Sequence, residues 1–224
     1  MNTRVYITDV STLANKASFE RLYSFVPTYR QQKIDRFKFD ADKFLSLGVG
    51  LLLKDACENF GIVGADERVA FTAAGKPYFE EHPNVHFSLS HSHERAMCVM
   101  STYEVGCDVE KIKGDKLKLA ERFFTPQEFT WLKGLQGEDA QKEGFYRIWT
   151  LKECYMKVTG LGLELGPEKF VMHIDGDNIS LDHEGPKPEY MFRELNLQDG
   201  YRYAFCLKNA PAGCVVDVEK RLYQ

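Results

Sequence analysis

The sequence has no excess of positive charge. Its 224 residues include 29 Lys and Arg against 33 Asp and Glu, which gives a net charge of −4. Proteins that coat nucleic acid are usually basic, so we expect no nucleic-acid partner. The longest uncharged apolar stretch, residues 44–53, is too short to span a bilayer, and the N-terminal residues lack the apolar core of a signal peptide. We therefore expect a cytoplasmic protein without a membrane partner.

Three other features are missing from the chain. None of the six cysteines forms a C-x-x-C pair, and they are spread over apolar segments, which favours free, buried thiols in a reducing cytosol. No Walker-type phosphate loop occurs, which counts against one large class of nucleotide hydrolases. No linker rich in Pro, Gly or Ser divides the sequence, so its length allows either one large domain or two small ones.

The patterns that are present predict a mixture of helices and strands. Apolar spacing and end signals favour helices at residues 44–59, after Thr125-Pro126-Gln127-Glu128, and at about 143–159. Strands are expected at 4–7, 69–71, 85–89, 96–101 and 105–110, and short strands alternate with turns from 170 to 219. Residues 96–111 are echoed by residues 204–220. A duplicated α+β unit would explain this echo, and coincidence between short strands is the alternative.

Two carboxylates mark one face of the strand at 105–110. Asp108 and Glu110 share that face because side chains alternate along a strand. Two oxygen ligands at this spacing suit Mg²⁺, which takes one or two carboxylates and completes its shell with water and phosphate oxygens. A solvated strand end is the alternative, and the similar Asp217-Val218-Glu219 shows how easily the pattern arises.

Further charged and polar residues could complete a site for an anion. Glu153 and Lys157 lie four residues apart, so one helix face presents a carboxylate and a cation, and a surface ion pair is the alternative. Ser90 and His91 at a strand end could contact a phosphate or be ordinary polar residues. The other candidates are cations that could equally be solvated surface residues: Arg30, Lys33, Arg36 and Lys76.

Several motifs occur in a fixed order along the chain. They are Gly75-Lys76-Pro77, then 87–92, then 105–111, and then the run 145–157 that contains Lys152, Glu153 and Lys157. This ordered set resembles the 4′-phosphopantetheinyl transferases, in particular the long two-lobed class that activates peptide and polyketide synthases. The resemblance implies an α+β fold of two similar lobes related by pseudo-twofold symmetry, with the ligand site in the cleft between them. We expect the lobes at residues 1–104 and 105–224, the second carrying the metal site.

The resemblance also implies roles for individual residues. Mg²⁺ would be held by Asp108, Glu110 and Glu153, with Asp108, Glu153 and Lys157 carrying the catalysis. The residues expected to bind coenzyme A are those matching the family's phosphate, adenine and ribose contacts: Arg30, Lys33, Ser46, Lys76, Pro77, Ser90, His91, Lys152 and Lys157. Ser46 and His91 would meet the 3′-phosphate together with Arg30 and Lys33, whereas Lys157 would meet the pyrophosphate and Lys152 would lie near it.

The implied enzyme moves the 4′-phosphopantetheine arm of coenzyme A to a serine of an apo carrier protein and releases 3′,5′-ADP. The carrier could be acyl, peptidyl or polyketide, and either Glu153 or a metal-bound water could take the serine proton. A monomer is favoured because a two-lobed chain can build its own cleft. Two alternatives remain: a Mg²⁺-dependent nucleotide or pyrophosphate hydrolase, and a non-catalytic module that binds carrier domains or coenzyme A.

Overall fold

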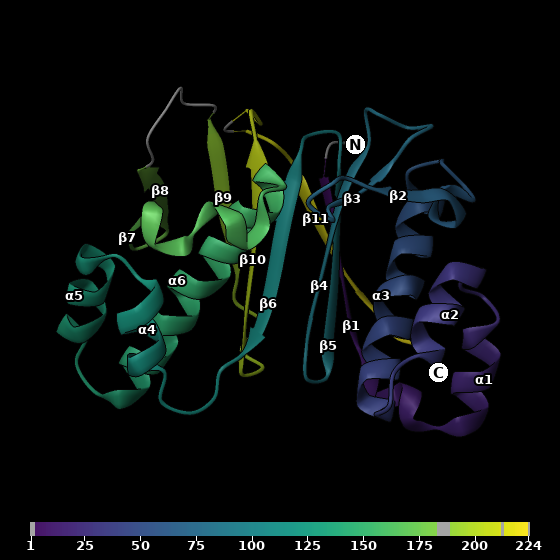
Figure 1. The fold of residues 1–224 in the computed structure, drawn as a ribbon, viewed down its shortest axis with the longest axis horizontal. Helices are drawn as coiled ribbons and strands as arrows, with labels where there is room; N and C mark the ends of the chain where they lie inside the picture. The colour runs from purple at the N-terminus through teal and green to yellow at the C-terminus, as the bar shows by residue number, and fades with distance from the viewer. Residues whose placement is uncertain (1–2, 183–188, 212, 224) are drawn as a thin grey trace. The chain divides into compact units, whose positions relative to one another are not determined.

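Runs of helices and runs of strands follow one another along the chain, of which a computed structural model describes residues 3–182, 189–211 and 213–223 (Figure 1). The expected α+β class is confirmed. The residues separate into two units, Met1–Glu104 with Gly213–Gln224 as unit 1, and Val105–Ala212 as unit 2. No helix within the described residues combines the length and the apolar character needed to cross a bilayer.

A four-stranded sheet forms the centre of unit 1. Its strands lie in the order β11-β1-β5-β4. They span Val216–Arg221 (β11), Thr3–Asp9 (β1), Arg95–Ser101 (β5) and His86–Ser92 (β4). β1 runs parallel to β11, and the other neighbours are antiparallel. A small hairpin of β2 (Val69–Phe71) and β3 (Pro77–Phe79) precedes β4.

One long helix covers this sheet. α3 (Asp40–Asn59) packs against β1, β4 and β5, and α2 (Thr28–Asp35) packs against α3. The first turn of α3 carries Asp40 and Asp42, whose charges favour a helix N-terminus. The apolar residues of α3 fill the core beneath it. The remaining helical segments of unit 1 are short: η1 (Val10–Ala14), α1 (Lys16–Tyr23) and η2 (Ala65–Arg68).

Unit 2 also places one long helix across an antiparallel sheet. The strands lie in the order β6 (Val105–Lys111), β10 (Tyr201–Lys208) and β9 (Tyr190–Leu195), and α6 (Glu138–Thr159) packs against β6 and β10. The other elements surround this layer: α4 (Leu117–Phe123), α5 (Pro126–Gly134), η3 (Gly162–Leu165), η4 (Pro167–Lys169), β7 (Val171–Asp175) and β8 (Asn178–Asp182). α5 begins with the predicted capping box of Thr125 and Glu128, which confirms that signal.

The end of the chain departs from the predicted lobe boundary. Residues 213–224 were expected to belong with 105–212, but β11 pairs with β1 over six residue pairs and completes the sheet of unit 1. The ion pair of Arg4 with Glu219 and the hydrogen bond from Tyr223 Oη to Asp55 add to this attachment. Residues 213–224 therefore belong to unit 1. The predicted second lobe, 105–224, is corrected to Val105–Ala212.

Candidate functional site

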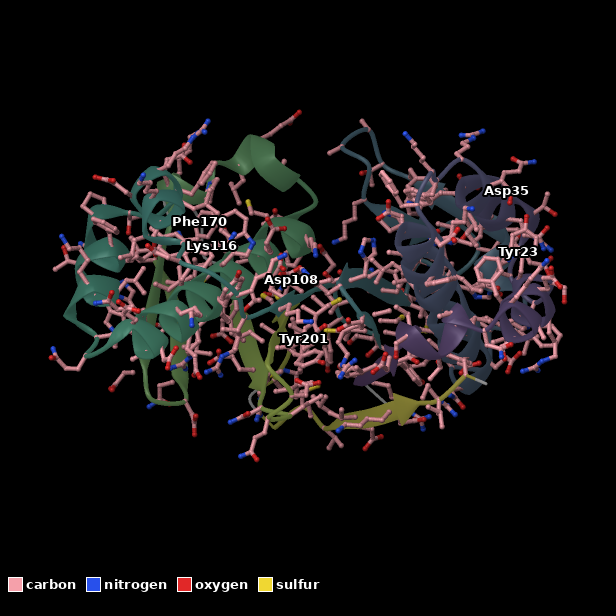
Figure 2. All side chains as sticks on the ribbon, turned by 90° about the horizontal axis from the view of Figure 1, so that it is seen from below. Tyr23, Asp35, Asp108, Lys116, Phe170 and Tyr201 are labelled. Atoms are coloured by element: carbon pink, nitrogen blue, oxygen red, sulfur yellow. The ribbon has the colours of Figure 1, made fainter. Side chains whose placement is uncertain are left out.

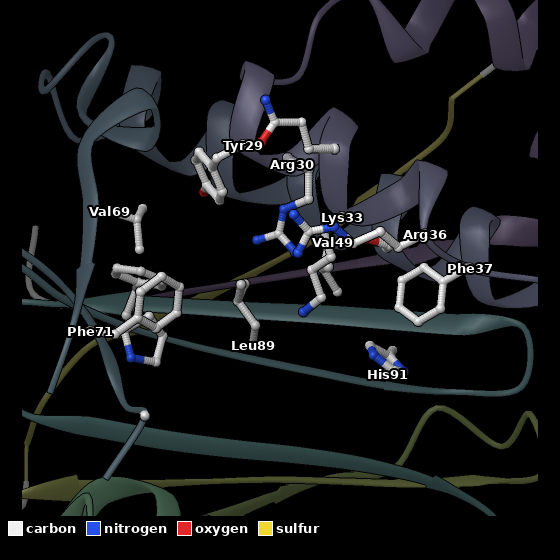
Figure 3. A pocket seen from close by; sticks show the side chains of 15 residues that line it. Tyr29, Arg30, Lys33, Arg36, Phe37, Val49, Val69, Phe71, Leu89 and His91 are labelled. Atoms are coloured by element: carbon white, nitrogen blue, oxygen red, sulfur yellow. The ribbon is translucent and has the colours of Figure 1, made fainter. Parts of the chain in front are cut away.

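A cavity of about 630 Å³ in unit 1 gathers many of the predicted coenzyme A residues (Figure 3). α2, α3, β4 and the β2–β3 hairpin build its walls. Five predicted residues line it: Arg30, Lys33, Ser46, Pro77 and His91. Arg36 and Gly75 line it as well. Residues that are separated by up to 61 positions in the sequence therefore share one cavity.

Two donors in this cavity are buried and lack a hydrogen-bond partner among the described residues. Arg30 is only 7% exposed and Ser46 only 3% exposed. The Arg30 Nε and Ser46 Oγ atoms make no hydrogen bond. A Cβ atom on Gly50 would lie 3.2 Å from Arg30 Cγ, so this glycine lets the Arg30 stem lie close against α3. Burying unsatisfied donors costs free energy, and an anion with several oxygens would satisfy both groups.

Lys33 adds a second cation to the cavity wall. Burial lowers the pKa of Lys33, and the neighbouring Arg30 charge lowers it further. A phosphate group between these cations would remove the repulsion and supply acceptors to each donor. The cavity therefore suits a phosphate-bearing ligand, and its wall residues Tyr29 and Phe71 add aromatic surface.

Four predicted coenzyme A residues fall outside the lining of this cavity: Lys152 and Lys157 belong to unit 2, and Ser90 and Lys76 belong to unit 1. Phe87, Leu89 and His91 alternate along β4 and face the cavity, so Ser90 lies on the other face of the strand. Lys76 is not among the described lining residues either, although its neighbours in the β2–β3 turn are. The structure thus brings His91 to the cavity and leaves Ser90 away from it.

The predicted carboxylates lie in unit 2, on β6 and on the helix that crosses it. Asp108 is buried on β6 (Figure 2), and its Oδ1 atom lies 2.7 Å from Lys157 Nζ. The same ammonium donates to the Cys107 carbonyl at 2.9 Å. A Cβ atom on Gly106 would lie 2.1 Å from the Cys154 carbonyl oxygen, so β6 and α6 approach backbone to backbone. This close approach places Lys157 directly against Asp108.

The charges of Asp108 and Glu110 affect the pKa of Glu153. The pKa of Glu153 is raised to about 7, chiefly by burial and then by the charge of Asp108, with a smaller contribution from Glu110, and Lys157 opposes the rise. Asp108, Glu110 and Glu153 are therefore close enough to repel one another. The described residues nevertheless include no group of three His, Cys, Asp or Glu side chains arranged to hold a metal ion. Because Mg²⁺ needs only one or two carboxylates beside water and substrate phosphate, the donor chemistry of this acidic cluster still suits it.

Lys152 occupies a different environment from the one predicted. Its side chain is fully buried, and its Nζ atom lies 2.7 Å from Glu128 Oε1. The same ammonium donates to the carbonyls of Pro167 at 2.7 Å and Phe170 at 2.8 Å. An ammonium has three donors, and all three are used. We therefore correct the prediction for Lys152: it ties α6 to α5 and to the start of β7, and has no donor left for coenzyme A.

Sequence reasoning missed part of the cavity wall. Tyr29 and Gln32 line it together with Lys33 and Arg36, and all four belong to α2 or its C-terminal cap. Their spacing of three and four residues places them on one helix face. This periodicity was the available signal, but the short polar α2 was not predicted as a helix.

Comparisons with known proteins identify the family to which this sequence is similar. The sequence model of the 4′-phosphopantetheinyl transferase superfamily matches residues 104–206. The 4′-phosphopantetheinyl transferase Sfp of Bacillus subtilis is 31% identical over 191 residues, which cover 84% of each chain. A second 4′-phosphopantetheinyl transferase of Bacillus subtilis is 30% identical with the same coverage. The 4′-phosphopantetheinyl transferase HetI of a Nostoc species is 33% identical over 138 residues, or 58% of each chain. The chain therefore belongs to the 4′-phosphopantetheinyl transferase superfamily, as its ordered motifs predicted.

Proposed function

We propose that the protein transfers the 4′-phosphopantetheine arm of coenzyme A to a serine hydroxyl of an apo carrier protein, in a Mg²⁺-dependent reaction that releases 3′,5′-ADP. Membership of the superfamily supports the transferase activity. The acidic cluster of Asp108, Glu110 and Glu153 beside Lys157 is the observation that carries the proposal. A module that only binds carrier domains would have no need for this set of charges.

The unit 1 cavity supports a role in holding coenzyme A. Arg30, Lys33 and Ser46 present donors for one phosphate group, and His91 lines the same cavity. We assign the 3′-phosphate to this group of side chains. Gly75 and Pro77 also line the cavity, and we assign the adenosine to their vicinity.

The acidic cluster supports the chemistry of the transfer. Asp108, Glu110 and Glu153 would hold Mg²⁺, which neutralises charge on the pyrophosphate when bound. Asp108 holds the Lys157 ammonium in place, so Lys157 offers a fixed cation for the charge that grows on the leaving phosphate. A bond forms between the serine oxygen and the pantetheine-side phosphorus, and the bond from that phosphorus to the bridging oxygen breaks. Glu153 would accept the serine proton either directly or through a water. Its pKa is about 7 without metal, and a bound Mg²⁺ would lower it, so both routes remain part of the proposal.

One experiment tests the proposal and separates it from the alternatives. The protein is mixed with coenzyme A, Mg²⁺ and an apo carrier protein, and the mass of the carrier is followed. A gain of one phosphopantetheine arm that disappears with EDTA is the expected result. Release of nucleotide from coenzyme A without modification of the carrier would instead indicate a hydrolase, and binding without either product would indicate a non-catalytic module.

A pair of variants tests the assignment of the base. Glu153→Gln should lower the transfer rate by orders of magnitude while coenzyme A still binds. Glu138→Gln changes an exposed carboxylate on the same helix and should behave as the wild type. Wild-type turnover by Glu153→Gln would refute its catalytic role.

The remaining partner assignments follow from composition and fold. We propose that the protein acts as a cytoplasmic monomer and has no nucleic-acid or membrane partner. The cysteines support this location, because all six are buried thiols. Sedimentation of the purified protein with and without a carrier protein measures its oligomeric state.

A further inference from the structure

Arg202 lies beside the acidic cluster, although none of the sequence motifs includes it. It belongs to β10 and is directly opposite Glu110 in the antiparallel pairing of β6 with β10. Residues paired in this way point to the same face of a sheet, with Cβ atoms about 4.5–5.5 Å apart. Ala204 is opposite Asp108 on the same face. Arg202 is therefore the cross-strand neighbour of one predicted metal ligand.

The helix across this face places a partner for Arg202 in line with the acidic cluster. Glu143, Tyr146, Thr150, Glu153 and Lys157 follow one another at spacings of three and four residues, which form one stripe along α6. Arg202 Nη2 pairs with Glu143 at the start of this stripe. Lys157 pairs with Asp108 at the other end. One cation thus stands at each end of the row of carboxylates.

At the Arg202 end of this row, one donor of the cation has no hydrogen-bond acceptor in the part of the chain that the structure describes. The Arg202 side chain is 18% exposed, whereas Glu143 is 53% exposed, so the pair with Glu143 lies toward solvent. The Arg202 Nε atom is buried and has no hydrogen-bond partner among the described residues. A buried guanidinium donor without an acceptor is costly, and a carboxylate opposite it on the next strand is the natural acceptor.

We propose that Arg202 is a positioning residue for the divalent cation of the transfer reaction, which it serves by orienting Glu110 and by reducing repulsion within the acidic cluster. This inference rests on the proposed function. Removal of a group that orients a metal ligand typically weakens metal binding about 10–100-fold. Because Arg202 acts through Glu110, its loss should change metal affinity more than the turnover rate at saturating metal.

The test compares metal binding with catalysis in four variants of the whole protein. Mn²⁺ binding with coenzyme A present is measured by electron paramagnetic resonance, and the Mg²⁺ dependence of carrier modification is measured separately. Arg202→Ala should weaken Mn²⁺ binding and raise the half-saturating Mg²⁺ concentration, each about tenfold or more, with a turnover rate at saturating Mg²⁺ within about threefold of the wild type. Arg202→Lys keeps the charge and should recover part of the affinity.

Two controls separate this role from a structural one. Glu143→Gln removes the solvent-facing ion pair but leaves Arg202 opposite Glu110, so its metal dependence should match the wild type. Arg193→Ala removes an exposed arginine from the other face of the same sheet and should also match it. Wild-type Mn²⁺ affinity in Arg202→Ala would overturn the proposal, as would an equal loss of affinity in Glu143→Gln.

The outcomes also separate this proposal from the proposed function. If the wild type modifies the carrier and Arg202→Ala has normal metal affinity, the positioning role fails and the transferase stands. If Arg202→Ala loses Mn²⁺ affinity but the wild type modifies no carrier, the positioning role stands and the transferase fails.

Discussion

Replacement of Lys152 by Met should destabilise unit 2 without a direct effect on coenzyme A binding. The methionine keeps most of the apolar stem but removes the ammonium that Glu128, Pro167 and Phe170 share. Glu128 then keeps only its hydrogen bonds from the backbone N–H groups of Thr125 and Met172, and the two carbonyls lose their donor. A buried carboxylate is left without its countercharge.

The expected loss is large compared with the stability of a typical domain. Removing one partner of a buried ion pair costs about 3–5 kcal/mol, and domains are usually stable by about 5–15 kcal/mol. With an m-value of about 2 kcal/mol/M in urea, the midpoint of unfolding should fall by about 2 M. Burial lowers the pKa of Lys152, and the Glu128 charge opposes this change. The stabilisation of the folded state by this pair therefore requires both side chains to be charged.

The chain provides its own probe for this measurement. Both tryptophans, Trp131 and Trp149, lie in unit 2, so their fluorescence in urea reports the unfolding of this unit. Lys142→Met changes a lysine on the surface of the same helix and should leave the curve unchanged. The KM for coenzyme A of folded Lys152→Met should stay at the wild-type value. Wild-type stability combined with a raised KM would refute the structural role and restore the predicted coenzyme A contact.

Three further predictions follow from the two sites. The pKa of Glu153 is about 7 without metal, so below pH 7 Mn²⁺ must displace a proton from this side chain. The affinity of the protein for Mn²⁺ should therefore fall by up to about tenfold per pH unit below pH 7 and be constant above it. An Mn²⁺ affinity of the wild type that does not change with pH would contradict this. Lys33→Met should weaken coenzyme A binding, measured by calorimetry, by about tenfold or more. The binding of 3′-dephospho-coenzyme A should not change. An equal loss of affinity for both ligands would exclude a contact of Lys33 with the 3′-phosphate. Gly106→Ala should lower the midpoint of thermal unfolding, because the new Cβ would lie 2.1 Å from the Cys154 carbonyl oxygen. Gly134→Ala is the control, because a Cβ at Gly134 would meet open space and should leave the midpoint unchanged. Equal midpoints for the two variants would refute the close approach of β6 and α6.

The local patterns predicted the long elements well, because each carries a strong periodic or capping signal. The helix expected at 44–59 is α3, which begins four residues earlier, and the capping box at Thr125 starts α5 as expected. The helix expected from about 143 begins at Glu138, since Gly137 and two acidic residues provide an earlier start. α2 was missed because Arg30 and Ile34 are its only buried residues, so it has no apolar stripe to recognise.

The candidate sites were predictable where one element carries several residues, and less so where packing decides. Asp108 lies beside Lys157, as the paired motifs suggested. The resemblance placed Lys152 near the pyrophosphate together with Lys157, but packing decides otherwise: the Lys152 ammonium is enclosed by Glu128 and two backbone carbonyls. Arg202 could not be found from spacing, since only the register of β10 against β6 brings it opposite Glu110.

The pairing of β11 with β1 has a consequence for how the protein is made. β1 precedes every residue of unit 2 in the sequence, whereas its partner β11 follows unit 2, so translation of all of unit 2 comes between the two strands. Until residues 216–221 emerge, one edge of β1 stays unpaired, and an open strand edge is a template for association with other chains. A nascent chain that stalls or ends before β11 would therefore leave the sheet of unit 1 open to aggregation. The damage would fall on unit 1 although the missing residues come after unit 2 in the sequence.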